Sequence, residues 1–197
     1  MRKRLISVLQ VALIALLAVS AAVGQSQSAQ SAIPKEKQTS RGLYVTSKEA
    51  HEMWKAEPEK VKILDVRTPE EYIFVGHAEM AWNIPLAIET YEWDASKGWF
   101  AMKLDPAFVS RVKKVFTPDD TLLVTCRSGG RSAMAVNLLT KAGYTNVYNI
   151  IDGVEGDMVK DPSNVFQGQR MKNGWKNSGL PWTYQVNPER MLLPKRQ

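Results

Sequence analysis

The feature that most constrains the fold is a regular alternation of short apolar runs with segments in which apolar residues recur at helical spacing. The strand-like runs cover residues 43–45, 61–66, 81–83, 121–125 and 146–151. Helical patterns lie between them, at residues 46–55, from residue 68, at residues 106–116 and at residues 132–141. Such alternation is typical of parallel strands that form a central sheet and of helices that cover it. The sequence therefore predicts a three-layer α/β sandwich with a mainly parallel sheet and helices on both faces.

Start signals precede three of the predicted helices. Thr46 and Glu49 stand three residues apart, which is the pattern of a capping box. Thr68 and Glu71 repeat that pattern, and a proline occupies the first helical position between them. Asp105 is placed to cap the next helix.

The only cysteine, Cys126, lies directly after the apolar run of residues 121–125 and shortly before the predicted helix of residues 132–141. Backbone N–H groups of a glycine-containing loop can converge on an anion, and a helix N-terminus adds about half a positive charge. Arg127 and Arg131 add two full charges. These surroundings favour a thiolate, so Cys126 is a candidate nucleophile for an anionic substrate. The alternative, that the thiol is a small buried hydrophobe, is disfavoured by the flanking arginines and glycines.

Cysteine and histidine counts exclude other kinds of site. One cysteine cannot form an internal disulfide or a Cys-x-x-Cys redox relay. His51 and His77 are the only histidines, so the sequence offers no ligand set for zinc or an iron–sulfur cluster. No cofactor is expected.

Residues 1–24 have the layout of a secretory signal peptide, with a basic start, an apolar stretch over residues 11–19 and small residues after it. An uncleaved membrane anchor is the alternative, because residues 5–23 approach the roughly 20 residues that span a bilayer. Loss of the leader removes three basic residues and no acidic one, so the formal charge falls from +6 to +3. We therefore expect an exported, periplasmic protein without stable membrane insertion after cleavage and without a nucleic-acid partner.

The remaining chain is predicted to contain one domain. Residues 25–41 are rich in Ser, Gln and Lys and are predicted to form a flexible linker. The domain is expected over residues 42–185, including a C-terminal extension, and residues 186–197 are expected to fray.

Two aromatic segments call for an interpretation. In the C-terminal extension, Trp175, Leu180 and Trp182 are expected to pack back on the domain. The aromatic-rich residues 91–100 either form a wall of the site or belong to the core, and the sequence leaves both open.

Several motifs occur in the order found in rhodaneses, or sulfurtransferases, and the chain resembles the exported single-domain form of that family over residues 43–156. The motifs are Asp65-Val-Arg67, Glu70-Glu-Tyr72, Gly76-His77, Asn83-Ile-Pro85, Cys126-Arg-Ser-Gly-Gly-Arg-Ser132 and Asp152-Gly153. As an ordered set they are specific, although each one alone is weak. Ala78-Glu79-Met80 departs from the Ile-Pro-Gly that the family usually has after its Gly-His pair.

The resemblance implies a rhodanese-like sandwich and a thiosulfate sulfurtransferase activity. Cys126 would attack the outer sulfur of thiosulfate or a similar anionic donor, release sulfite and hold the sulfur as a persulfide. A thiophilic acceptor, a small molecule or a protein, would then take the sulfur. The residues assigned to substrate binding are Arg127, Ser128, Gly129, Gly130, Arg131 and Ser132. The loop N–H groups would stabilise the anionic sulfur, and Arg127 and Arg131 would hold the donor.

Other functions remain as alternatives to this one. A non-turnover persulfide carrier or anion-binding module that serves a partner protein would use the same residues. A dual-specificity phosphatase resembles Cys-x5-Arg, whereas the spacing here is Cys-x4-Arg and Ser132 stands where the phosphate-binding arginine would be. A cysteine protease needs a histidine base, and the place of His77 in its turn fits a structural role. Asp65 and Arg67 are likewise expected to fix the loop after their strand.

Overall fold

The structure, a computed structural model, describes residues 33–194 of the chain. The predicted signal peptide lies outside the described residues, as do the first part of the predicted linker and residues 195–197, so the leader remains a prediction. Within residues 33–194, no helix combines the length and the hydropathy of a membrane span.

A five-stranded parallel sheet forms the centre of the fold, in the order β1-β7-β6-β2-β3. The strands are β1 (Tyr44–Val45), β2 (Val61–Asp65), β3 (Trp82–Asn83), β6 (Thr121–Thr125) and β7 (Val147–Ile150). Strand β6 lies in the middle and pairs with β2 along its whole length, so that Thr125 faces Asp65 where both strands end. Apolar and β-branched residues suit such strands because both faces are covered. The predicted parallel sheet is confirmed.

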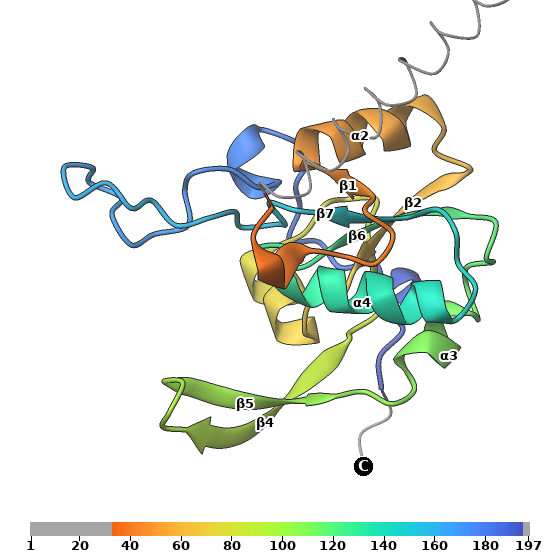
Figure 1. Cartoon of the computed structure of the whole chain (residues 1–197), viewed down its shortest axis with the longest axis horizontal. Helices are drawn as coiled ribbons and strands as arrows, with labels where there is room; N and C mark the ends of the chain where they lie inside the picture. Colours follow the sequence, from red (N-terminus) through yellow and green to blue (C-terminus); the bar gives the residue numbers. More distant parts are fainter. Residues whose placement is uncertain (1–32, 195–197) are drawn as a thin grey trace, which may run out of the picture.

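Helices cover both faces of this sheet (Figure 1). Helix α2 (Ser47–Ala56) lies on one face, and α3 (Phe108–Val112) and α4 (Gly130–Lys141) lie on the other. The side chains of β6 alternate accordingly: Leu123 packs on the α2 side, and its two neighbours pack on the α4 side. The predicted three-layer sandwich is confirmed.

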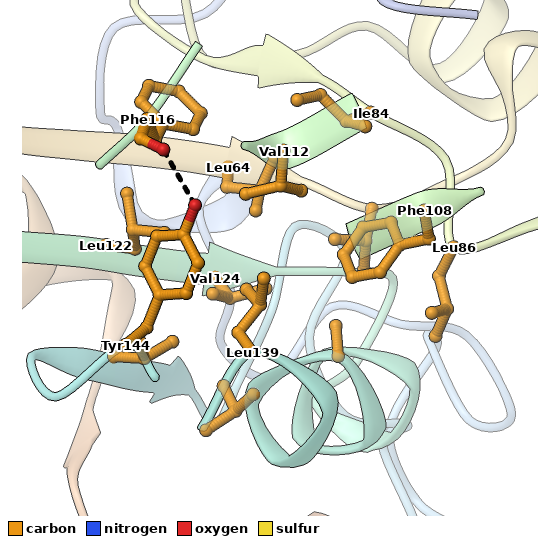
Figure 2. Packing of buried hydrophobic residues seen from close by; sticks show 14 of the residues in the cluster. Leu64, Ile84, Leu86, Phe108, Val112, Phe116, Leu122, Val124, Leu139 and Tyr144 are labelled. Atoms are coloured by element: carbon orange, nitrogen blue, oxygen red, sulfur yellow. Dashed lines mark hydrogen bonds between the residues drawn. The ribbon is translucent and has the colours of Figure 1, made fainter. Parts of the chain in front are cut away.

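Figure 2 shows the larger apolar cluster, which fills the space between the sheet and α3 and α4. Phe108 and Val112 of α3 and Leu139 of α4 contribute to it, and the Tyr144 hydroxyl donates to the Phe116 carbonyl at 2.7 Å. Burying one such side chain stabilises the fold by about 1.5–3 kcal/mol. This packing holds α4, and with it the loop that carries the cysteine, against β6.

Both predicted capping boxes are present. Thr46 Oγ1 accepts the Glu49 N–H at 3.3 Å, and the Glu49 carboxylate accepts the Thr46 N–H at 2.7 Å, at the start of α2. Thr68 and Glu71 exchange the same two bonds at 3.2 and 3.1 Å. After the second box the chain forms a short π-helix, η2 (Glu71–Val75).

The prediction of one helix over residues 106–116 is wrong, because α3 spans only five residues. Asp105 begins a turn by accepting the Ala107 N–H at 3.0 Å. Beyond α3 the backbone includes i,i+3 bonds, such as Val115 N–H to Val112 O at 3.1 Å. This tighter bonding ends the regular helix early, although the apolar stripe still faces the core.

An antiparallel hairpin of β4 (Ala87–Asp94) and β5 (Trp99–Leu104) projects from the domain (Figure 1). Trp99 is 56% exposed, so the interpretation of the aromatic residues as core is wrong. A two-stranded ribbon outside the main sheet has no further layer against which to bury them. The hairpin still approaches the cysteine loop, where Met102 Sδ lies 4.0 Å from Arg131 Nη1.

Residues 33–41 pack on the domain, so the prediction of a flexible linker is wrong for this part. They include the 3₁₀ turn η1 (Lys35–Lys37). Lys37 is buried, and its ammonium pairs with Asp157 Oδ1 at 2.7 Å. The polar composition suggested a solvated chain, but these polar groups bind the domain instead.

The C-terminal extension covers the α2 face. Trp175 is buried and directly precedes the 3₁₀ turn η3 (Lys176–Ser178). Its indole N–H donates to the carbonyl of Pro181, which follows that turn, at 2.9 Å. Leu180 and Trp182 pack against the same apolar cluster. The prediction that these aromatic and apolar residues return to the domain is confirmed.

The chain after residue 185 remains in contact with the domain. It forms the 3₁₀ turn η4 (Pro188–Arg190), from which Arg190 Nη1 donates to the Glu79 carbonyl at 2.9 Å. Leu192 N–H then donates to the Asn83 carbonyl at 2.9 Å. The predicted fraying is therefore wrong up to residue 192, because these contacts extend the edge of the sheet beside β3.

Candidate active site

Cys126 follows the last residue of β6 and is 2% exposed. Its Sγ accepts the Gly129 N–H at 3.2 Å, and the Ser132 Oγ lies 3.4 Å away. The sulfur is thus held at the carboxyl edge of the parallel sheet, beside the first turn of α4. Ligands of open α/β sheets bind at this edge.

The loop between Cys126 and α4 depends on glycine. Gly129 has φ +97° and precedes the first residue of α4, and a side chain there would collide with the Ile151 carbonyl. The left-handed backbone at Gly129 turns its N–H toward the sulfur. It also starts α4 at Gly130, two residues before the predicted Ser132.

Ser132 and Asn149 form a buried polar pair behind the sulfur. Asn149, on β7, donates its two amide hydrogens to the carbonyls of Lys37 and Gly129, at 2.9 and 3.0 Å. Its oxygen is thereby left to accept the Ser132 hydroxyl at 2.6 Å. Because a hydroxyl carries one hydrogen, Ser132 donates either to Asn149 or to Cys126 at a given moment.

Arg131 forms a two-point ion pair with Glu71. Its Nη1 and Nη2 donate to Glu71 Oε2 and Oε1, both at 2.6 Å, and the two side chains are 22% and 17% exposed. Burial opposes ionisation of Glu71, but the hydrogen bonds and charge of Arg131 outweigh it and hold the Glu71 pKa below its ordinary value. The Glu71 carboxylate thus offsets the charge of Arg131. The contact of Arg131 with an anionic sulfur donor stays a prediction.

A cleft of about 1210 Å³ adjoins the cysteine loop. Ser128 and Gly130 line this cleft, and residues 157–173 form much of its other wall. Arg127 is half-buried, and within the described part of the chain its side chain has no ion pair. Arg127 is therefore the loop cation that remains available to an anion.

The chain after β7 supports the loop from beneath. Val154 N–H and Glu155 N–H donate to the carbonyls of Cys126 and Arg127 at 2.8 and 2.9 Å. Gly153 has φ +64°, and a Cβ there would lie 2.6 Å from the Cys126 carbonyl oxygen. The Asp152-Gly153 motif thus serves the backbone of the cysteine loop.

The residues expected to be structural make structural contacts. Arg67 and Asp65 are fully buried and paired, with Nη2 to Oδ2 at 2.6 Å, and Arg67 also donates to the Gly76 carbonyl at 2.8 Å. His77 stacks on Tyr72 with ring centroids 3.6 Å apart, and burial lowers its pKa. In residues 33–194 neither histidine of the chain contacts Cys126, so the candidate nucleophile has no histidine base beside it.

Asn149, Lys37 and Arg170 were not singled out from the sequence. The sequence did contain a sign of Asn149, because it is the one amide within the apolar run of residues 147–151. Lys37 and Arg170 had none, because they reach the site from segments of ordinary polar composition. Within the described residues, no group of three or more His, Cys, Asp or Glu side chains is placed to hold a metal ion.

Comparison with known proteins identifies this arrangement. The family model of the Rhodanese-like domain matches residues 46–158. The chain belongs to the rhodanese-like family, and the fold and the position of the cysteine loop agree with that membership.

Two curated plant proteins and one solved structure are similar to the chain. Thiosulfate sulfurtransferase 16, chloroplastic, of Arabidopsis thaliana is 39% identical over 92 residues, which cover 47% of this chain and 69% of that protein. Senescence-associated protein DIN1 of Raphanus sativus is 38% identical over 92 residues, 47% of this chain and only 45% of that protein. The crystal structure of Rv0390 from M. tuberculosis has 28% identity and a TM-score of 0.56, over 72% of this chain and 96% of that one. Family and relatives support a function of the sulfurtransferase type.

Proposed function

We propose that the protein is a sulfurtransferase that moves sulfane sulfur from thiosulfate or a similar anionic donor to a thiophilic acceptor through a Cys126 persulfide. The observation that carries the proposal is the buried Sγ of Cys126 at the end of β6, which accepts the Gly129 N–H inside a glycine loop. Membership of the rhodanese-like family and the similarity to a thiosulfate sulfurtransferase support it.

The proposed reaction has two displacement steps. The Cys126 thiolate attacks the outer sulfur of thiosulfate, an S–S bond forms to the cysteine, and sulfite leaves with the electron pair of the broken bond. An acceptor nucleophile then attacks the outer sulfur of the persulfide, and the thiolate leaves. Neither step needs an external oxidant or reductant, and no cofactor is required.

The chain's own groups have distinct parts in these steps. The Gly129 N–H donates to the sulfur while it is anionic, which lowers the cost of both the thiolate and the persulfide. Arg127 is proposed to bind the oxyanion end of the donor. When the Ser132 hydroxyl turns from Asn149 toward the sulfur, it adds a second hydrogen-bond donor. Its Oγ lies 3.4 Å from the Cys126 Sγ in the structure. Ser128 and Gly130 are proposed to shape the entrance.

A persulfide carrier without turnover is the second candidate, because the burial of Cys126 would protect a bound sulfur from solvent. Two measurements on the reduced protein separate the enzyme from the carrier. The first is the release of thiocyanate from thiosulfate and cyanide, and the second is the intact mass of the protein after treatment with thiosulfate alone. Turnover with a gain of about 32 Da supports the enzyme, since one sulfur is added to the nucleophile. The mass gain without turnover supports the carrier. Absence of the mass gain overturns both, and Cys126→Ser is the control that must lack turnover and mass gain.

We further propose that residues 1–24 direct export to the periplasm and are then removed. The basic start, apolar stretch and small residues of that segment carry this proposal. N-terminal sequencing of the protein recovered from the periplasmic fraction is expected to begin near residue 25. Recovery of the intact N-terminus in the membrane fraction would overturn cleavage and favour the membrane anchor.

A further inference from the structure

The charge of the cysteine loop poses a problem for a doubly charged donor. Two arginines belong to the loop, but Glu71 accepts one N–H from each terminal nitrogen of the Arg131 guanidinium. Arg127 alone is left without a carboxylate partner in the loop. A site for an anion such as thiosulfate, with two negative charges, would be better balanced by a second available cation.

Arg170 comes from a different part of the chain, and the positive charge of Arg127 acts on its guanidinium. Its Nη1 donates to the Gly156 carbonyl at 2.7 Å, and the preceding residue, Glu155, donates its N–H to the Arg127 carbonyl at 2.9 Å. The Arg170 side chain and the Arg127 backbone therefore bind consecutive residues of the segment after β7 that supports the cysteine loop. Arg170 also lines the cleft together with Ser128 of that loop.

The side chain of Arg170 is anchored but its charge is not paired. Asn177 donates to the Arg170 carbonyl at 3.0 Å, which fixes the backbone. Within residues 33–194 no carboxylate lies within ion-pair distance of the guanidinium. Asp157, an acidic residue of the cleft wall, binds the Lys37 ammonium and the Asn173 amide instead.

The electrostatics of Arg170 fit an anion site. Burial and then the positive charge of Arg127 lower the pKa of Arg170, whereas Glu155, Asp157 and the charge of Cys126 oppose that shift. Two half-buried cations that repel each other are relieved when an anion binds between them. Arg170 lies in residues 157–173, almost entirely beyond the family-matched region, which ends at residue 158.

We propose that Arg170 and Arg127 together bind the oxyanion end of the donor, so that the cleft beside the cysteine loop selects small, doubly charged anions with a terminal sulfur. The inference rests on the proposed function for the identity of the donor. The anion site itself does not require turnover, because any anionic reagent that approaches Cys126 would feel it.

Alkylation of the only cysteine tests the site without sulfur transfer. Iodoacetate carries a negative charge and iodoacetamide is neutral, so the ratio of their rates at Cys126 reports the local charge. Arg170→Gln keeps a donor for the Gly156 carbonyl and removes the charge. We expect the iodoacetate-to-iodoacetamide ratio to fall about 5- to 10-fold in Arg170→Gln and in Arg127→Gln, and to change little in Arg170→Lys.

Arg190→Gln is the matched control, because Arg190 also donates to a backbone carbonyl, that of Glu79. Inorganic sulfate should protect Cys126 of the parent chain from iodoacetamide, and half-protection should need more sulfate in Arg170→Gln than in Arg190→Gln. An unchanged alkylation ratio in Arg170→Gln would show that Arg170 only braces Gly156 and would overturn the inference, whatever the ratio in Arg127→Gln. Loss of thiosulfate turnover with the expected ratios would instead count against the proposed function alone.

Discussion

Glu71 joins two loops that follow neighbouring strands, and its replacement isolates the structural role of Arg131. Each carboxylate oxygen accepts one N–H of the Arg131 guanidinium at 2.6 Å, and Oε2 also accepts the Thr68 N–H at 3.1 Å. Glu71→Gln keeps the size of the side chain and one acceptor oxygen but removes the charge. We predict a less stable protein that still contains a nucleophilic Cys126.

The magnitude follows from the bond that is lost. The amide oxygen of Glu71→Gln can accept one guanidinium N–H, whereas its NH₂ group faces the other donor. A hydrogen bond to a charged group contributes about 1.5–3 kcal/mol. The side chains of Arg131 and Glu71 are 22% and 17% exposed, so partial screening favours the lower part of that range, about 1.5–2 kcal/mol. For a domain of this size the midpoint of thermal unfolding would fall by about 3–8 °C.

The pH dependence gives a second, independent check. Burial raises the cost of charging Glu71, but the bonds from Arg131 outweigh it, and the pKa in the folded protein lies below the ordinary value. A carboxylate with a lowered pKa stabilises the fold fully above its unfolded pKa, about 4.3, and loses that effect as the pH falls through its folded pKa. The difference between the parent chain and Glu71→Gln should therefore be complete near neutral pH and should shrink below about pH 4.

Urea unfolding near neutral pH and in acid, followed by tryptophan fluorescence to which the buried Trp175 contributes, measures both quantities. Glu70→Gln is the control, because the adjacent Glu70 is exposed, and it should change stability by less than about 0.5 kcal/mol. A Glu71→Gln protein within about 0.5 kcal/mol of the parent at neutral pH would refute the reasoning. A deficit that is the same in acid would assign the effect to packing and not to charge.

Three further predictions concern buried parts of the site. Gly153→Ala should lower the free energy of unfolding by about 1–3 kcal/mol and slow the alkylation of Cys126. The reason is that φ of Gly153 is +64° and a Cβ would lie 2.6 Å from the Cys126 carbonyl oxygen. An unchanged alkylation rate would show that the loop tolerates the shift. Arg67→Met should lower the free energy of unfolding by about 3–5 kcal/mol, since Asp65 is left buried without its partner, and Arg67→Met combined with Asp65→Asn should regain part of it. Asn149→Ala should lower the free energy of unfolding in urea by about 2–4 kcal/mol, because two buried carbonyls lose their donors. Full thiocyanate production by the folded variant would show that Asn149 does not position the loop.

Local sequence patterns were enough to predict the central sheet, two helix starts and the position of the cysteine. The apolar run of residues 121–125 is buried on both faces as β6, and its composition alone indicated a central strand. The boxes of Thr46 and Thr68 form because both partners lie within one turn. Since a parallel strand delivers the next residue to the carboxyl edge of the sheet, the position of Cys126 was predictable as well.

Contacts between distant polar segments could not be predicted in the same way. Residues 33–41 carry no apolar pattern, yet Lys37 is buried and its carbonyl accepts the Asn149 amide beside the cysteine loop. For the aromatic residues of the hairpin of β4 and β5 the sequence left a core position and a site wall both open. They are exposed, because within the ribbon Phe100 contacts Tyr91 and Trp93 but no further layer covers them. Hydrophobic periodicity reports burial against a layer, whereas a single hydrogen bond or ion pair across the fold leaves no period in the sequence.

Arg127 and Arg131 show where that limit affects function. Both flank the same glycine pair and both add one charge, so the sequence predicts the same role for each. The fold separates them, because Glu71, in the capping turn after β2, pairs with Arg131, while the Arg127 side chain has no ion pair within the described residues. In the proposed site, the charge that an anionic donor meets is thus set in part by Arg170, which is far from the loop in sequence. If this is correct, exchanging the charge of Arg170 should alter anion reactivity at Cys126, whereas breaking the Arg131 pair should mainly alter stability.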